Sequence, residues 1–223
     1  MKKNYEMDMC SGPILGKLLT FTIPLIFSGI LQLLFNAADV IVVGRFAGSQ
    51  SLAAVGSTTA LINLMINIFI GLSVGVNVIV ARYYGAKREK DVQDTIHTAM
   101  ALSIVSGLFL IIVGQLLSRP MLELMGTPDD VIDKSTIYMR IIFIGMPANM
   151  IYNFGSAILR AVGDTKRPLY FLTAAGVINV VLNLFFVIMF QMDVAGVALA
   201  TAISQAISAC LVILCLMESE GGL

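Results

Sequence analysis

Asp39 is the only carboxylate in the interior of the long apolar stretches of this sequence, so its chemistry is the first to need an explanation. It lies in the stretch 18–43, which at ~1.5 Å per helical residue is long enough to cross a ~30 Å hydrocarbon layer. A charge at that depth costs several kcal/mol unless it is paired or used. Either Asp39 takes up a proton or a cation as part of a mechanism, or it is a structural acid that stays neutral or paired.

Amide and hydroxyl side chains recur at the same depth in other apolar stretches. Asn179 and Asn183 are four residues apart and share one helical face, as do Asn36 and Asp39 at a spacing of three. Such groups favour either a polar site or interhelical hydrogen bonds, which are worth about 0.5–2 kcal/mol each. The full set is Gln32, Asn36, Asn63, Asn67, Asn77, Asn149, Asn153, Ser156, Asn179, Asn183, Thr201, Ser204, Gln205 and Ser208.

Pro24 precedes Asp39 in the same stretch. Proline removes a backbone donor and clashes with the preceding helical turn, so we expect this helix to bend there or to be able to bend. A bend near an acid that changes its protonation would act as a hinge coupled to that acid. The alternative is a static kink.

The composition is that of an integral membrane protein. Hydrophobic residues make up 58% of the chain, charged residues make up 13%, and the mean hydropathy is +0.91, all outside the range of soluble domains. Lysine plus arginine and aspartate plus glutamate balance at 14 each, so nothing favours a nucleic-acid partner. The three cysteines are split between a polar segment and an apolar helix, which argues against a disulfide framework.

The apolar stretches predict an all-α bundle of six transmembrane helices, because helices satisfy every backbone group within lipid. An N-terminal segment, 1–14, and a C-terminal tail, 218–223, flank a bundle at 15–217. An even number of crossings places both termini on one side. The excess of Lys and Arg in the connections on that side predicts that both termini are cytoplasmic and that the protein is multi-pass in the cell membrane. The spans are 15–43, 52–81, 94–117, 135–160, 168–191 and 194–217.

Two local patterns predict helix contacts. Gly71 and Gly75 have the Gly-x-x-x-Gly spacing that lets helices approach closely. The connection at 191–193 is so short that the last two helices must form an antiparallel hairpin.

Several segments together resemble the multidrug and toxic compound extrusion (MATE) transporters over nearly the whole chain. They are Pro24 with Asp39, the Gly-Asp-Thr-Lys-x-Pro turn within 160–168, the Asn-x-x-Leu-Asn pattern within 178–183 and the small-residue helix start at 194–201. The resemblance implies a fold of two six-helix bundles that face each other across a cleft. It also implies an antiporter that exports amphiphilic, often cationic, organic compounds in exchange for protons or sodium ions.

The resemblance further implies the site residues. Asn183 stands where several members carry a second acid, so coupling would rest on Asp39. A proton or a sodium ion at Asp39 would be the coupling ion, with no cofactor and no other metal, and Pro24 would be the hinge. The cation-binding network falls on Asp39, Asn153, Ser156, Asn179, Asn183 and Thr201. A substrate cleft is expected at Gln32, Asn36, Met146 and Met150, since methionine surfaces repack around varied ligands.

The chain is long enough for one lobe of such a transporter, the N-terminal one. Alternating access by rocking one bundle against another needs two bundles. The expected partners are therefore small organic substrates, the lipid bilayer and a second six-helix lobe. That lobe is either a missing C-terminal half or another copy of this chain.

Two other functions are open from the sequence. Flipping of lipid-linked sugars would require a basic cleft, and Arg140 and Arg160 are the only cations near it, both close to helix ends. A membrane scaffold that transports nothing is the second alternative. An enzyme is not expected, because there is no His-Glu-x-x-His motif, no second embedded acid for an aspartyl protease, and a lone His97.

Overall fold

The computed structural model describes residues 5–220, nearly all of them helical. Two π-helical turns, η1 and η2, extend α1 and α6. The elements are α1 (Ile14–Val42), η1 (Val43–Ala47), α2 (Ser49–Gly85), α3 (Glu89–Leu124), α4 (Asp129–Ile144), α5 (Met146–Ala161), α6 (Lys166–Leu184), η2 (Phe185–Met189) and α7 (Asp193–Glu220).

The described residues cross a membrane up to six times. Five helices, counted with the π-helical turns that extend them, are long and apolar enough to span it. The pair α4 and α5 passes the same test together and is bent by 48°, so it supplies the sixth crossing. The prediction of an all-α membrane fold is confirmed.

The fourth span differs from its prediction as one helix over 135–160. It begins earlier, at Asp129, and breaks at Gly145. Pro147, in the first turn of α5, has no N–H to continue the α4 hydrogen-bond ladder. The bend fits against α3, where a Cβ on Gly107 would lie 2.3 Å from the Pro147 Cα and one on Gly114 would lie 2.2 Å from the Phe143 ring.

Helix ends extend past the predicted spans because hydropathy detects only the hydrocarbon-facing part of a helix. α3 runs over Glu89–Leu124 instead of 94–117, and its first turn carries Glu89 and Asp91, acids that favour a helix N-terminus. Residues 5–13 form a non-helical segment before α1, and residues 218–220 of the predicted tail complete α7. The remaining predicted tail residues, 1–4 and 221–223, lie outside the described residues.

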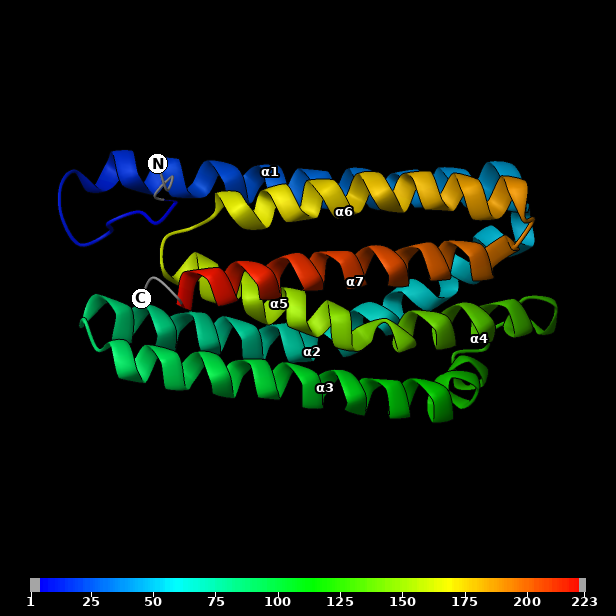
Figure 1. Cartoon of the computed structure of the whole chain (residues 1–223). Coiled ribbons are helices and arrows are strands. Elements are labelled where there is room, and N and C mark those ends of the chain that lie inside the picture. The colour runs from blue at the N-terminus through cyan, green and yellow to red at the C-terminus, as the bar shows by residue number, and fades with distance from the viewer. Residues whose placement is uncertain (1–4, 221–223) are drawn as a thin grey trace.

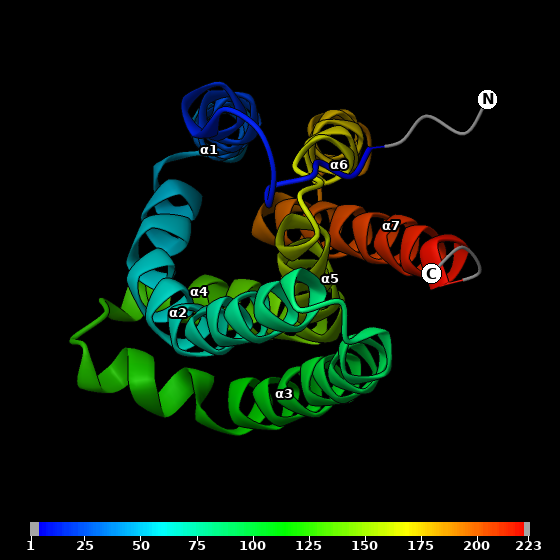
Figure 2. The same cartoon turned by 90° about the vertical axis from the view of Figure 1, so that its left-hand side faces the viewer.

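The helices form a bundle in which α5 is central. α5 packs against α2, α3 and α7, and α6 packs against both α1 and α7. Figure 1 shows α1 and α6 side by side and running in the same direction, with α2 and α3 on the opposite side of the bundle (Figure 1). The end-on view places α5 and α7 between these two pairs (Figure 2). The main core lies around α5 and includes Phe143, Phe154, Met146 and Met150, all fully buried.

Both ends of the described chain lie at one end of the bundle (Figure 1). We call this the terminal end and the opposite one the far end. The α2–α3 and α5–α6 turns are also at the terminal end, whereas the α1–α2, α3–α4 and α6–α7 connections are at the far end. The last two helices form the predicted hairpin.

The expectation for Gly71 and Gly75 was wrong among the described residues. A Cβ on either glycine would meet nothing within 4 Å, so no neighbouring helix approaches this face of α2. A pair of glycines marks a face that could be approached closely, but the sequence does not say whether another helix is there.

Candidate cation-binding site

Asp39 lies on α1 near the far end of the bundle and contacts α6. The side-chain amide of Asn183 donates a hydrogen bond to one oxygen of the Asp39 carboxylate. Asn179, one turn earlier on the same face of α6, also interacts with this carboxylate. Asn183 is fully buried, Asn179 is nearly so, and Asp39 is half-buried. The structure therefore brings together three of the predicted site residues.

A close contact between α1 and α6 sets which turns of the two helices lie side by side. A Cβ on Gly176 would lie 1.9 Å from the ring of Phe35, so only glycine lets that ring pack against α6. Phe35 is one helical turn before Asp39, and Gly176 is one turn before Asn179. Because α1 and α6 run in the same direction, the next turns of both helices place the carboxylate beside the amides (Figure 1).

The Asp39 carboxylate has no cation against it within residues 5–220, since none of their ion pairs includes it. Tyr138 of α4 lies close enough to this carboxylate to interact with it electrostatically. Tyr138 packs against a second core cluster at this end, formed by valines such as Val42, Val187 and Val197. The site is thus an acid held between amides, a phenol and an apolar wall.

Two oxygen atoms in the site have no hydrogen-bond partner in the described chain. They are the buried side-chain carbonyl oxygens of Asn179 and Asn183. Buried polar atoms normally find a partner, so an orphan pair of acceptors beside an acid requires an explanation. Carboxylate and amide oxygens are the ligands that hard cations prefer. A rotation of each amide would present oxygen in place of nitrogen to a cation at Asp39.

The donor set fits a proton or a monovalent cation. A cluster of three or more His, Cys, Asp or Glu side chains able to hold a metal ion is absent from the described residues. One carboxylate and neutral amides match a single positive charge without leaving excess negative charge in a low-dielectric region.

The other members of the predicted network bond within their own helices. Asn153 donates to the carbonyl and to the side-chain oxygen of Asn149, at 2.8 and 2.9 Å. Thr201 donates to the Val197 carbonyl at 3.0 Å. Ser156 is buried, and its hydroxyl has no hydrogen-bond partner among residues 5–220. No hydrogen bond of the described residues joins these three side chains to Asp39.

The residues predicted to line a substrate cleft separate into two environments. Gln32 and Asn36 are exposed on α1, near Asp39. Met146 and Met150 have no exposed surface and belong to the main core, so in this conformation they pack the α4–α5 bend instead of lining an open surface.

Pro24 lies inside α1, which continues through it as one α-helix. The proline is buried, and its carbonyl accepts a 2.9 Å hydrogen bond from the Ser28 hydroxyl.

Sequence reasoning missed two residues that bear on the sites. Tyr138 approaches Asp39 from α4, and the only signal for it was a phenol inside an apolar stretch. Asp164, taken as part of a polar turn, is fully buried. Its signal was the position just before a helix, where an acid can bind free backbone N–H groups.

Comparison with known proteins identifies the family. A MatE family model matches residues 24–185, which is most of the chain. The chain belongs to the MatE family. This family shares the fold described above, and its match begins at Pro24 and includes Asp39, Asn179 and Asn183.

Two relatives from Bacillus subtilis carry the name of probable multidrug resistance proteins. The chain is 35% identical over 188 residues to the probable multidrug resistance protein YoeA of Bacillus subtilis, covering 82% of this MatE chain and 41% of YoeA. It is 31% identical over 201 residues to YpnP of the same organism, also a probable multidrug resistance protein, covering 90% of this chain and 45% of YpnP.

A solved structure agrees with the fold. The outward-facing conformation of a multidrug resistance MATE family transporter of the MOP superfamily superimposes with a TM-score of 0.84 at 26% identity. The match covers 90% of this MatE chain and 44% of that one. The chain thus spans less than half the length of the relatives it matches. Its architecture is that of one lobe of a MATE transporter.

Proposed function

We propose that this MatE chain is the N-terminal lobe of an antiporter that exports amphiphilic, often cationic, organic compounds in exchange for protons or sodium ions. Asp39 is the group that binds the coupling cation. The proposal rests on the group of oxygen atoms formed by the Asp39 carboxylate and the side-chain carbonyls of Asn179 and Asn183. The Asp39 carboxylate, which has no cationic partner within residues 5–220, faces two amides whose carbonyl oxygens are buried and have no hydrogen-bond partner there.

Coupling follows from the chemistry of this cluster. When a proton or sodium ion binds, the charge of Asp39 is neutralised and the amides can turn their oxygens toward the ion or their N–H groups toward the carboxyl. When the ion leaves, Asn183 donates to the bare carboxylate, as it does in this structure. The two states differ in the hydrogen bonds between α1 and α6. Cation occupancy therefore changes how these two helices pack, and a ligand that favours one packing shifts the equilibrium.

α1 is the element best placed to move. It contacts mainly α6 and the π-helical turn after it, and most of its surface is exposed. Pro24 weakens its hydrogen-bond ladder in the middle, and we propose that α1 bends there as Asp39 loads and unloads. Gln32 and Asn36, exposed on the same helix, are the proposed substrate contacts. Met146 and Met150 are left out, because they are sealed in the core.

A second six-helix lobe completes the transporter in this proposal. The chain spans 41% to 45% of its relatives, and alternating access needs two bundles. The second lobe is either a further part of the same protein or another copy of this chain. We propose that the terminal end is cytoplasmic, because ten of the 14 lysines and arginines fall in the segments and connections assigned to that side.

The experiment is gradient-driven efflux from proteoliposomes. The chain is reconstituted alone and as a tandem fusion of two copies, loaded with ethidium, and energised by a proton gradient or by a sodium gradient in separate arms. The Asp39→Asn variant should lose gradient-driven efflux while it still purifies as a folded protein. The matched control Asp94→Asn changes an exposed acid on α3 and should behave as wild type. Undiminished efflux by Asp39→Asn would rule out the coupling role.

A further inference from the structure

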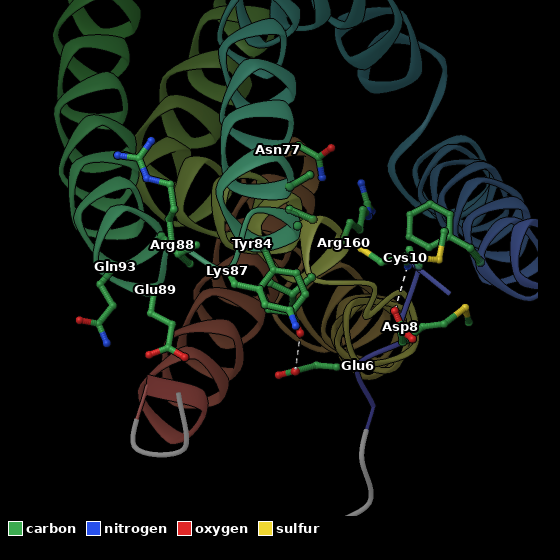
Figure 3. A pocket seen from close by; sticks show the side chains of 18 residues that line it. Glu6, Asp8, Cys10, Asn77, Tyr84, Lys87, Arg88, Glu89, Gln93 and Arg160 are labelled. Carbon is green, nitrogen blue, oxygen red and sulfur yellow. Dashed lines mark hydrogen bonds between the residues drawn. The ribbon is translucent and has the colours of Figure 1, made fainter. Parts of the chain in front are cut away.

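A cavity of about 700 Å³ lies at the terminal end of the bundle, distant from Asp39 along the helices. The N-terminal segment, α1, α2, the start of α3 and the end of α5 line it, and most of the lining surface is apolar. Its volume is in the range of small-molecule sites, which is about 300–1,000 Å³. Figure 3 shows its lining, with Arg160 between α2 and the N-terminal segment (Figure 3).

The N-terminal segment is held in place as one wall of this cavity. The Tyr84 hydroxyl donates to the Glu6 carboxylate at 3.0 Å, which ties the segment to α2 (Figure 3). Gly163, at φ +85°, lets the segment lie on the α5–α6 turn, because a Cβ there would be 2.6 Å from the Met7 carbonyl oxygen. The Tyr5 ring stacks 5.2 Å from the Arg167 guanidinium. Specific contacts therefore fix the N-terminal wall of the cavity to α2 and to the α5–α6 turn.

Arg160 is a cation of this cavity that no acid of the described residues pairs with. Its Nε atom is buried and has no hydrogen-bond partner, and no ion pair of residues 5–220 includes it. A partly buried guanidinium without an acid is costly, since its buried N–H loses hydration and gains no compensating charge. Arg167, on the next helix, shows the usual solution by pairing with Asp164.

The other charged groups of the lining are mostly engaged. Glu6 accepts from Tyr84, and the Asp8 carboxylate accepts from the Ser11 hydroxyl and the Cys10 N–H, bonds that lower the pKa of Asp8. Arg88 pairs with Asp91 at 2.7 Å. Within the described chain, Glu6, Lys87, Glu89 and Arg160 are the charged lining residues that are in no ion pair, and their formal charges cancel. Arg160 differs from the other three in that the atom without a partner is buried.

We propose that this cavity binds an amphiphilic phosphate, with the phosphate oxygens on Arg160 and an apolar stem among Met7, Phe21 and Val162. A guanidinium matches phosphate oxygens with paired N–H donors. A bare phosphate ion would fill only a small part of 700 Å³, so the apolar lining calls for a ligand with a stem. At the end of a membrane-spanning bundle the nearest source is the head group of a phospholipid, and a free organic phosphate ester is the other source of the same chemistry.

The test measures ligand binding to the purified chain in detergent. A fluorescent short-chain phosphatidylglycerol is the probe, and glycerol 3-phosphate and inorganic phosphate are the competitors. Arg160→Gln should weaken probe binding at least about tenfold, the loss expected for a charge-assisted contact. The matched control Arg45→Gln removes an exposed arginine at the far end and should leave binding unchanged. Asp39→Asn should also bind the probe normally, because the proposal does not depend on cation coupling.

A second variant keeps the proposal testable if Arg160→Gln does not fold. Ala81→Phe places a ring in the cavity without changing any charge and should weaken the lipid probe several-fold. Weak competition by glycerol 3-phosphate would identify a lipid as the ligand. Competition as tight as that of the lipid, and equally dependent on Arg160, would identify a soluble phosphate ester. Wild-type affinity in either Arg160→Gln or Ala81→Phe, or failure of the wild-type chain to bind any of the three compounds, would overturn the proposal.

Discussion

Asp39 is half-buried and Asp164 is fully buried, and the two carboxylates differ in their hydrogen-bond and ion-pair partners. Asp164 is fully buried at the start of α6, where it accepts the N–H groups of Lys166 and Arg167 at 3.1 Å each and pairs with the Arg167 guanidinium. Among residues 5–220, Asp39 is in no ion pair and accepts a hydrogen bond from the neutral amide of Asn183, and two amide oxygens beside it have no hydrogen-bond partner. The difference separates a charge used to hold the fold from a charge left available for a ligand.

The largest effect should come from the paired acid. Asp164→Asn leaves the half-buried Arg167 without its counter-charge, and breaking such a pair should lower the free energy of unfolding by about 3 kcal/mol. The loss of helical circular dichroism on heating in detergent measures this as a lower Tm. Asp94→Asn, which removes an exposed acid, should leave the Tm unchanged. If Asp164→Asn were as stable as wild type, the claim that Asp164 stabilises the fold whereas Asp39 is available for a ligand would be wrong.

An intermediate effect is expected where α1 meets α6. Gly176→Ala places a methyl group 1.9 Å from the Phe35 ring, and this overpacking should lower the free energy of unfolding by about 2 kcal/mol. It should also move Asp39 away from Asn183. Gly71→Ala is the matched control, because a Cβ there meets nothing within 4 Å. A second change, Phe35→Leu, should restore part of the stability, and absence of any rescue would mean that the ring does not set the register.

The smallest effect on stability should come from the unpaired acid. Asp39→Asn removes no ion pair and keeps an amide that can bond with Asn183, so we expect the free energy of unfolding to change by less than about 1 kcal/mol. The same melting experiment checks this value. A loss as large as that of Asp164→Asn would show that Asp39 is a structural acid.

Much of the fold was accessible from the sequence, because the length of an apolar stretch is a strong signal in membrane proteins. Asp39, Asn179 and Asn183 could be grouped from their depth and spacing, together with the family resemblance. The bend at Gly145 was missed, although Pro147 is visible in the sequence, because hydropathy does not distinguish a broken span from a straight one. Tyr138 was missed because its approach to Asp39 depends on where α4 lies relative to α1, which the sequence does not show.

The terminal-end cavity was out of reach for a different reason. Residues 5–13 are not helical, and neither periodicity nor hydropathy predicts the course of such a segment across other helices. Arg160 was placed near a helix end, where a cation can reach water. The structure buries its Nε atom because the N-terminal segment closes over that end. The sequence does not distinguish the asparagines of α6, which contact Asp39, from those of α5, which form no hydrogen bond with it in the described part of the chain. Only the structure shows that Asn153 donates its hydrogen bond to Asn149.

The most direct test of the account is cation binding by Asp39 at equilibrium. Binding of labelled sodium to the purified chain, and proton release on addition of ethidium, are measured in parallel for wild type, Asp39→Asn and Asp94→Asn. We expect wild type and Asp94→Asn to show at least one of these signals, and Asp39→Asn to show neither while remaining folded. A sodium or proton signal that persists undiminished in Asp39→Asn would contradict this expectation.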